Sequence, residues 1–423
     1  MRLLVLALAL GAASAAHADD LLQVWAEARA ADPLLRQAAA LSGAQEASAR
    51  EARAALLPQW QLQRSELRES GGARWNTTTS SLSQPLIDLA ALREWDASRS
   101  QASAQAARLA AAEQNARLRV AEAYFGLLSA QAQLATARAN EEAFARQVAE
   151  ADTRFKAGLS AQVEADQSRA YRELARTGTL AAEAAVADAR EALSQLTGAT
   201  PPTLQPLRQT LAAQPLPDDA EAWARRAEAA NPALRALQLD VQASEQRISS
   251  ARAGHLPTLS VGVDTQRLRG DNVSPFDAGR TPTQLALRLT VPLFAGGATA
   301  AAADRAGFQR DAAREQLEAG RRAVLREVRA EHLAVGQGAA QLQATQAAVE
   351  AAERALESTR TGLTLGTRGT TDLLLAIQTL AAAQNAQTQA RHRHVLALLA
   401  LHLAAGSLGD AELVAVNALL ENR

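Results

Sequence analysis

An internal duplication constrains the fold of this 423-residue chain more than any other feature. The tripeptide Asp-Pro-Leu at 32–34 corresponds to Asn-Pro-Ala at 231–233, an offset of 199 residues, and Gly158 corresponds to Gly366 at an offset of 208. The larger second offset indicates an insertion between these landmarks, which exposed loops tolerate. We therefore expect two structural repeats, 19–210 and 211–423.

Each repeat contains segments with a period of two, which predict a β-hairpin. Residues 283–294 place leucine or valine at every odd position from 285 to 293, with mostly polar residues between them. Residues 257–269 alternate in a similar way, so the two segments are expected to pair. In the first repeat, about 58–69 and 74–87 take the corresponding places, although their alternation is weaker because the second segment is largely polar.

Outside these hairpins the pattern is helical over unusual lengths. Mostly apolar residues recur at every seventh position from Val120 to Phe155 and again from Val328 to Leu363. A heptad repeat of this length predicts long helices that supercoil against their neighbours. Each series stops just before a glycine, a residue that disfavours helix interiors by roughly 0.5–1 kcal/mol relative to alanine. The predicted helical hairpins therefore cover about 88–198 and 296–405, each with a glycine at its turn.

The N-terminal residues 1–18 read as a secretory signal peptide. One basic residue precedes an apolar run that ends in Ala-His-Ala, so cleavage is expected before Asp19. No later stretch approaches 18 consecutive apolar residues, so a mature chain that crosses a membrane is expected to do so as a β-barrel. The chain has no cysteine, which excludes disulfides and a lipid-bearing cysteine after the signal.

Nothing in the chain indicates an enzyme. His392 and His394 are two residues apart on a predicted helix and point about 200° away from each other, which disfavours a shared metal ion. No Ser-His-Asp arrangement, phosphate-binding loop or HExxH pattern is found. The formal net charge of −1 disfavours an electrostatic nucleic-acid binder. We expect no catalysis, no cofactor, no metal and no nucleic-acid partner.

The duplicated order of helix, β-hairpin, long helix, turn and helix behind a signal peptide resembles the TolC family of outer-membrane efflux proteins. The resemblance covers essentially the whole mature chain. It is sharpest at two segments, Phe155-Lys156-Ala157-Gly158-Leu159 with Glu164 and Leu365-Gly366-Thr367-Arg368 with Asp372.

The resemblance implies a mainly α-helical fold with a small β part, assembled as a homotrimer. Three copies of four strands would form a 12-stranded β-barrel in the outer membrane, joined to an α-helical barrel in the periplasm. Such a protein is the exit duct of a tripartite efflux pump or a type I secretion system. Its implied partners are outer-membrane lipid, a periplasmic adaptor protein and, through that adaptor, an inner-membrane pump or ABC transporter.

The resemblance also suggests roles for the turns of the helical hairpins. Gly158, Leu159, Gly366 and Thr367 are simple turn residues in one interpretation. In the other they form the grooves at the tip of the tube that receive the adaptor. The two interpretations are compatible.

Two interpretations likewise exist for Glu164 and Asp372, each of which follows its turn glycine by six residues. Acids in a first helical turn complement the helix dipole, worth about 0.3–1 kcal/mol. Alternatively, Arg368 reaches a neighbouring hairpin and pairs with Glu164 to keep the tip closed, while Asp372 lines the aperture. A partly exposed pair contributes about 0–1 kcal/mol, but three symmetric copies can bias a two-state gate.

A soluble periplasmic coiled-coil adaptor is the alternative function. The alternating strand at 283–294 distinguishes the two, because so regular an apolar face requires lipid or a second sheet to cover it. An adaptor would also contain a contiguous small β domain, which the sequence lacks.

Overall fold

The computed structural model describes residues 20–68, 70, 74–199, 203–208, 218–270 and 280–421. The signal peptide predicted for residues 1–18, its cleavage site at Asp19 and the predicted boundary between the repeats at 210 and 211 lie outside the described residues.

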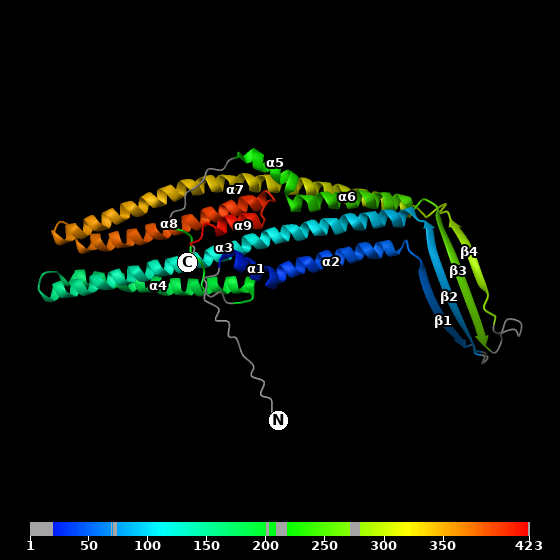
Figure 1. Cartoon of the computed structure of the whole chain (residues 1–423), viewed down its shortest axis with the longest axis horizontal. Coiled ribbons are helices and arrows are strands. Elements are labelled where there is room, and N and C mark those ends of the chain that lie inside the picture. The colour runs from blue at the N-terminus through cyan, green and yellow to red at the C-terminus, as the bar shows by residue number, and fades with distance from the viewer. Residues whose placement is uncertain are drawn as a thin grey trace, which may run out of the picture. The chain divides into compact units, whose positions relative to one another are not determined.

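Helices and strands follow one another in an order that repeats along the chain (Figure 1). The first repeat contains α1 (Leu21–Ala31), α2 (Pro33–Ala54), β1 (Gln59–Arg68), β2 (Arg74–Ile87), α3 (Leu89–Lys156) and α4 (Gln162–Thr197). The second contains α5 (Ala220–Ala230), α6 (Pro232–Ala253), β3 (Thr258–Gly270), β4 (Thr283–Thr290), α7 (Ala298–Thr364) and α8 (Thr370–Ala404), followed by α9 (Asp410–Asn417). The same order of elements in both halves agrees with the predicted duplication.

The repeated Asp-Pro and Asn-Pro pairs start corresponding helices. The Oδ1 atom of Asn231 accepts hydrogen bonds from the N–H groups of Ala233 and Leu234, at 2.9 and 3.2 Å. Asp32 accepts one from the N–H of Leu34 at 2.9 Å. Because proline lacks an N–H and has a helical φ, it fits the first position after such a cap. These caps explain why α2 and α6 begin where they do.

The strands agree with the prediction except at the end of β4. The sequence predicts a strand up to residue 294, but β4 ends at Thr290. Pro292 has no N–H to donate to a neighbouring strand, which ends regular pairing there. The corresponding Pro85 stays within β2, where the pairing with β3 shifts in register before Ile87.

The chain folds into two compact units. The hairpin unit comprises Met1–Leu35, Glu113–Ala230 and Leu325–Arg423, and the sheet unit comprises Arg36–Ala112 and Asn231–Val324. The hairpin unit therefore contains both helical turns, and the sheet unit contains all the described strands.

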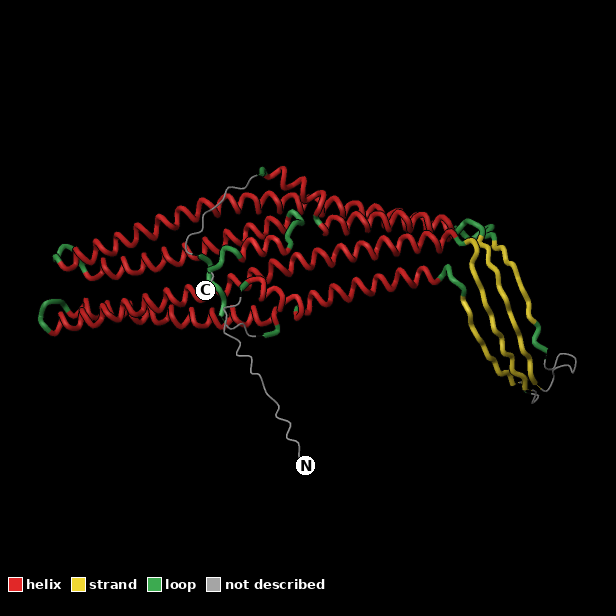
Figure 2. Tube along the Cα trace, viewed as in Figure 1, coloured by secondary structure: helices red, strands yellow, loops and turns green. Residues whose placement is uncertain are grey.

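In the sheet unit the strands form one antiparallel sheet in the order β1-β2-β3-β4 (Figure 2). Leu259, Val261 and Val263 of β3 lie opposite Leu289, Leu287 and Leu285 of β4, so all six share one face. Trp60 and Leu82 continue the row of Val263 across β1 and β2. We call the side formed by these eight residues the apolar face. Its β4 leucines are 64–76% exposed, so no described part of the chain covers the face there.

The hairpin unit is held together by a large apolar core. Tyr124, Phe125 and Leu127 of α3 are at most 1% exposed and pack with Leu193 of α4 and Leu399 of α8. The Tyr124 and Phe125 rings form a T-shaped pair, with centroids 5.4 Å apart. Burying large side chains of this kind contributes roughly 1.5–3 kcal/mol each.

The heptad positions are buried to different extents in the two long helices. In α7, Val328, Val335 and Leu342 are at most 8% exposed, as the predicted packing against neighbouring helices requires. In α3, Leu127 is buried, but Phe155 at the end of its series is 42% exposed. The heptad positions of α3 are therefore less buried near the turn than in the middle of the helix.

His392 lies inside the hairpin-unit core rather than at a metal site. Its Nδ1 atom is 2.5 Å from the Ser129 hydroxyl, and its ring centroid is 5.5 Å from that of Phe125. The neighbouring His394 faces elsewhere, with its Nδ1 close to Gly338 of α7. Among the described residues, no group of three or more His, Cys, Asp or Glu side chains is placed to hold a metal ion.

Acid should weaken the hairpin unit through His392. Burial, and to a smaller extent the charge of Arg391, lowers the pKa of His392 from 6.5 to about 4. Between these values the unfolded chain binds a proton that the folded chain excludes, so the free energy of unfolding falls as pH drops from 6.5 to 4. The full loss is about 3 kcal/mol. Urea unfolding at several pH values should show this dependence, and His392→Gln should reduce it. An unchanged pH dependence in the variant would contradict the assignment.

None of the described helices is both long enough and apolar enough to span a membrane.

Candidate functional site: the hairpin tips

Two glycines with left-handed backbones form the turns of the helical hairpins. Gly158 has φ +73° and Gly366 has φ +74°, values that favour glycine because a Cβ atom is disfavoured there. Around Gly158, the Leu159 N–H donates to the Arg154 carbonyl at 2.9 Å; around Gly366, the Thr367 N–H donates to Gly362 at 2.8 Å. These are the bonds of a Schellman helix end. Both glycines are therefore turn residues, as the sequence indicates.

Arg368, in the turn between α7 and α8, lies against the last turn of α7. A Cβ atom at Gly362 would come within 2.6 Å of the Arg368 Cγ, so only glycine leaves room for the arginine side chain there. The Thr367 hydroxyl also donates to the Gly362 carbonyl, at 3.1 Å. Gly362 is thus a second glycine that shapes this turn. The sequence pattern does not indicate this role, because the local motif does not determine the path of the Arg368 side chain.

Glu164 contacts the other hairpin, but through a threonine instead of Arg368. Its Oε2 atom accepts a hydrogen bond from the Thr370 hydroxyl at 3.1 Å. One turn further on, the Thr371 hydroxyl donates to the Gln167 side chain at 3.2 Å. Within the part of the chain that the structure describes, no ion pair joins Arg368 to Glu164. The starts of α4 and α8 are therefore held side by side by neutral donors.

The Asp372 side chain caps the N-terminus of α8. Its Oδ2 atom accepts a hydrogen bond from the Gly369 N–H at 3.2 Å. This bond satisfies a backbone donor that the helix leaves free and places a negative charge at the positive end of the helix dipole. The carboxylate remains exposed, so the cap leaves it accessible to ions in solution.

A small apolar cluster supports the tips from behind. Phe144 of α3 and Leu373, Leu374 and Ile377 of α8 are at most 6% exposed and pack together. Tyr171 of α4 joins them, its ring centroid 5.7 Å from that of Phe144. The cluster contains side chains from both hairpins, so it keeps the two tips together.

Apolar side chains are exposed at both tips. Leu159 and Leu365 are each 72% exposed, and Val163 is 59% exposed. Exposed apolar side chains gathered at one place are typical of protein-binding surfaces. Leu159 is among the residues predicted for the tip, whereas Leu365 is known from the sequence only as part of the motif around Gly366.

A hollow of about 490 Å³ lies behind the tips, between α3, α4 and α8. Its α4 wall is made of small residues, among them Gly178, Ala181 and Ala182. Side-chain amides, including those of Asn140 and Gln378, also line it. Small residues allow another helix to approach closely, and amides offer it hydrogen bonds.

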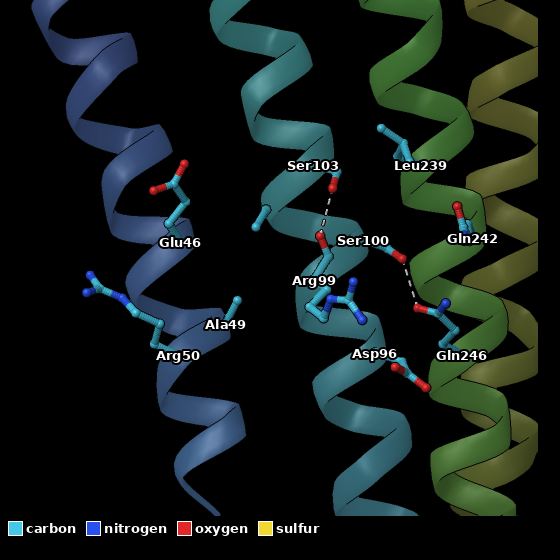
Figure 3. A pocket seen from close by; sticks show the side chains of 11 residues that line it. Glu46, Ala49, Arg50, Asp96, Arg99, Ser100, Ser103, Leu239, Gln242 and Gln246 are labelled. Carbon is cyan, nitrogen blue, oxygen red and sulfur yellow. Dashed lines mark hydrogen bonds between the residues drawn. The ribbon is translucent and has the colours of Figure 1, made fainter.

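The sheet unit contains a second hollow, of about 650 Å³, between α2, α3 and α6 (Figure 3). The Ser100 hydroxyl donates to the Gln246 side chain at 2.9 Å, which ties α3 to α6. Figure 3 shows Ser103 turned back toward the Arg99 carbonyl, to which it donates at 3.1 Å. The groups lining this hollow serve helix packing and offer no pair of nucleophile and base.

The family model described as "Outer membrane efflux protein" matches residues 24–199 and 223–407. The match therefore includes both repeats, both sets of strands and both turns.

The chain is also similar to individual relatives. It is 31% identical to the outer membrane protein TolC of Vibrio cholerae, over 96% of this chain and 94% of that protein. It is 29% identical to the alkaline protease secretion protein AprF of Pseudomonas aeruginosa, over 80% and 72% of the two chains. The solved structure of the CmeC outer membrane channel of Campylobacter jejuni has the same fold, with a TM-score of 0.81, 18% identity and coverage of 95% and 90%.

Proposed function

The chain belongs to the outer membrane efflux protein family, and from this membership we propose that it forms the outer-membrane exit duct of an efflux pump or a type I secretion system. The observation that carries the proposal is the family match across both repeats, since a duct of this kind requires both hairpins. The relatives are named as outer membrane and secretion proteins. The family is one of transport proteins and not a class of enzymes.

The duct is a homotrimer in this proposal. Among the described strands, β1 and β4 each have one neighbour, which leaves two edges of the sheet open. Open edges with exposed apolar residues favour pairing with another copy. Three copies would supply twelve strands to close the sheet into a barrel, with the apolar face toward lipid. A soluble adaptor would have no use for the exposed leucines of β4.

The tips are the periplasmic, adaptor-facing end of the duct in this proposal. Leu159, Leu365 and Val163 would contact the adaptor, with Gly158, Gly366 and Thr367 shaping the turns. The small-residue hollow between α3, α4 and α8 supports the approach of an adaptor helix. The energy source would reside in the inner-membrane pump or ABC transporter behind the adaptor.

The duct is tested by assembly and conductance. Mass measurement of the full chain extracted from outer membranes should give three copies, and the purified trimer should conduct ions in planar bilayers. A stable monomer, or recovery of the chain in the detergent-free periplasmic fraction, would exclude the duct.

The closed tip is tested at Arg368 and Glu164. In the proposed trimer, Arg368 reaches Glu164 of the adjacent copy, while Thr370 holds Glu164 within its own chain. Arg368→Ala and Glu164→Gln should therefore each raise conductance, and the double variant should add little, as coupled partners do. Asp372→Asn should mainly lower cation selectivity, because it removes carboxylates from the aperture.

Arg360→Ala provides the matched control, since Arg360 is an exposed arginine of α7, the helix that leads into the turn containing Arg368. It should leave conductance unchanged. Conductance equal to that of the unaltered protein in both Arg368→Ala and Glu164→Gln would exclude the gate and leave the two residues with structural roles.

A further inference from the structure

Beyond its leucines, the apolar face of the sheet carries a group of arginines, and we propose that this group binds the phosphate-bearing headgroups of lipids in the outer leaflet. The inference rests on the proposed function, in which the sheet lies in the outer membrane with its hairpin turns outward.

The strand register places the arginines on the same side as the leucines. Directly paired residues of antiparallel strands share a face, and the side alternates with each residue along a strand. Trp60, Leu82 and Val263 form one row of this face. Arg64 follows Trp60 by four residues along β1 and so lies on the same face. It pairs with Thr78 of β2, which pairs with Arg267 of β3. The next rows join Glu66 to Asn76 and Arg269, and Arg68 to Arg74. The arginine cluster is formed by Arg64, Arg68, Arg74, Arg267 and Arg269.

The cluster lies at the end of the sheet that carries the turns. The apolar rows lie near the strand ends that connect to α2, α3 and α6, whereas Arg68 and Arg74 flank the turn between β1 and β2. Successive rows on one face are about 7 Å apart, and residues two strands apart are separated by about 10 Å. The arginines therefore begin within about 14 Å of the Trp60 row, a distance that a lipid headgroup and its acyl chains span together.

The charge of the cluster is almost uncompensated by the strands. Glu66 is the one carboxylate on this face of the strands and pairs with Arg64 at 3.0 Å. Five arginines and one glutamate give a net charge of 5 − 1 = +4. The other strand carboxylate, Asp264, pairs with Ser81 on the opposite face. β4 contains no acidic residue, so an adjacent copy that pairs through this strand would bring no countercharge.

All five arginines of the cluster are exposed. Guanidinium groups bind phosphate oxygens in a bidentate manner, which makes phosphate the favoured anion for such a group. Because the cluster is continuous with an apolar surface, a ligand that combines phosphates with acyl chains covers both at once. A soluble anion would leave the adjoining leucines exposed.

The experiment measures binding of a bisphosphorylated lipid A to the full-length trimer in a zwitterionic detergent, by native mass spectrometry and by titration. The dephosphorylated form of the same lipid and inorganic phosphate serve as comparison probes. The test variant combines Arg64→Gln, Arg267→Gln and Arg269→Gln. The control is Arg288→Gln, an exposed arginine that pairs with Ser260 on the other face of the same sheet.

The unaltered trimer and Arg288→Gln should bind the phosphorylated lipid at least tenfold more tightly than the dephosphorylated one. The triple variant should lose about 100-fold in affinity, since each basic residue near an anionic membrane surface contributes about 1 kcal/mol, or about fivefold. Equal affinity of the triple variant, equal binding of both lipids, or full displacement by millimolar inorganic phosphate would overturn the inference. Trimer mass is measured on every sample, because loss of the trimer in the unaltered chain would instead refute the duct itself.

Discussion

Leu287→Arg should prevent the protein from accumulating in outer membranes. Leu287 is 68% exposed in the single chain and lies in the middle of the apolar face, opposite Val261. An arginine facing lipid near the bilayer midplane costs about 2–4 kcal/mol in a β-barrel. Three copies raise this to roughly 6–12 kcal/mol per trimer, comparable to the total stability of many proteins, about 5–15 kcal/mol.

The control for this prediction lies on the other face of the same strand. Gln284 is exposed and pairs with Asp264, so Gln284→Arg adds the same side chain next to a carboxylate on the polar face. This variant should assemble normally. The measurement is the amount of trimer in the outer-membrane fraction, relative to the unaltered protein. Normal accumulation of Leu287→Arg, or equal loss in both variants, would show that the apolar face does not meet lipid.

The elements that could be predicted from the sequence are those with local causes. The period of two in β3 and β4, the spacing of seven in α7 and the glycines at the turns each depend on neighbours within a few residues. The caps at Asp32 and Asn231 are also local. These signals are strong enough to identify the elements and their order, and the family resemblance then supplied the arrangement.

The contacts of the candidate site could not be predicted, because they depend on how one helix is positioned against another. A shift of one residue between α4 and α8 would move Glu164 away from Thr370 without changing any heptad. The packing of Arg368 over Gly362 likewise depends on the path of the chain after the turn. In β1 the alternation is weak, so the side on which Arg64 lies became clear only from its pairing with Thr78.

Gly158→Val and Gly366→Val, combined in one chain, should abolish export while leaving the trimer intact. Both glycines have φ near +73°, and no atom lies within 4 Å of a Cβ built on either. An added Cβ atom therefore meets no clash at either site, and the cost that remains is the strain of a left-handed backbone, about 1–2 kcal/mol at each site. The strain is relieved if the turn changes shape, which would displace Leu159 and Leu365 from the proposed adaptor surface. A cost of this size at two sites lowers the population of the native tip conformation by roughly tenfold or more.

Assembly should survive because the turns lie outside the large core around Tyr124 and Phe125. Gly369→Ala is the matched control, since this neighbouring glycine has φ −91°, which any residue adopts, and open space around its Cβ position. A chain with Gly158→Asn and Gly366→Asn should export more than the double valine variant, because asparagine tolerates the left-handed backbone better than valine. Export is measured with the pump and adaptor present, and trimer content is measured in the same cells. If the double valine variant exports normally, the tips are not the surface that meets the adaptor. If Gly369→Ala is equally defective, crowding at the tip and not backbone strain is responsible.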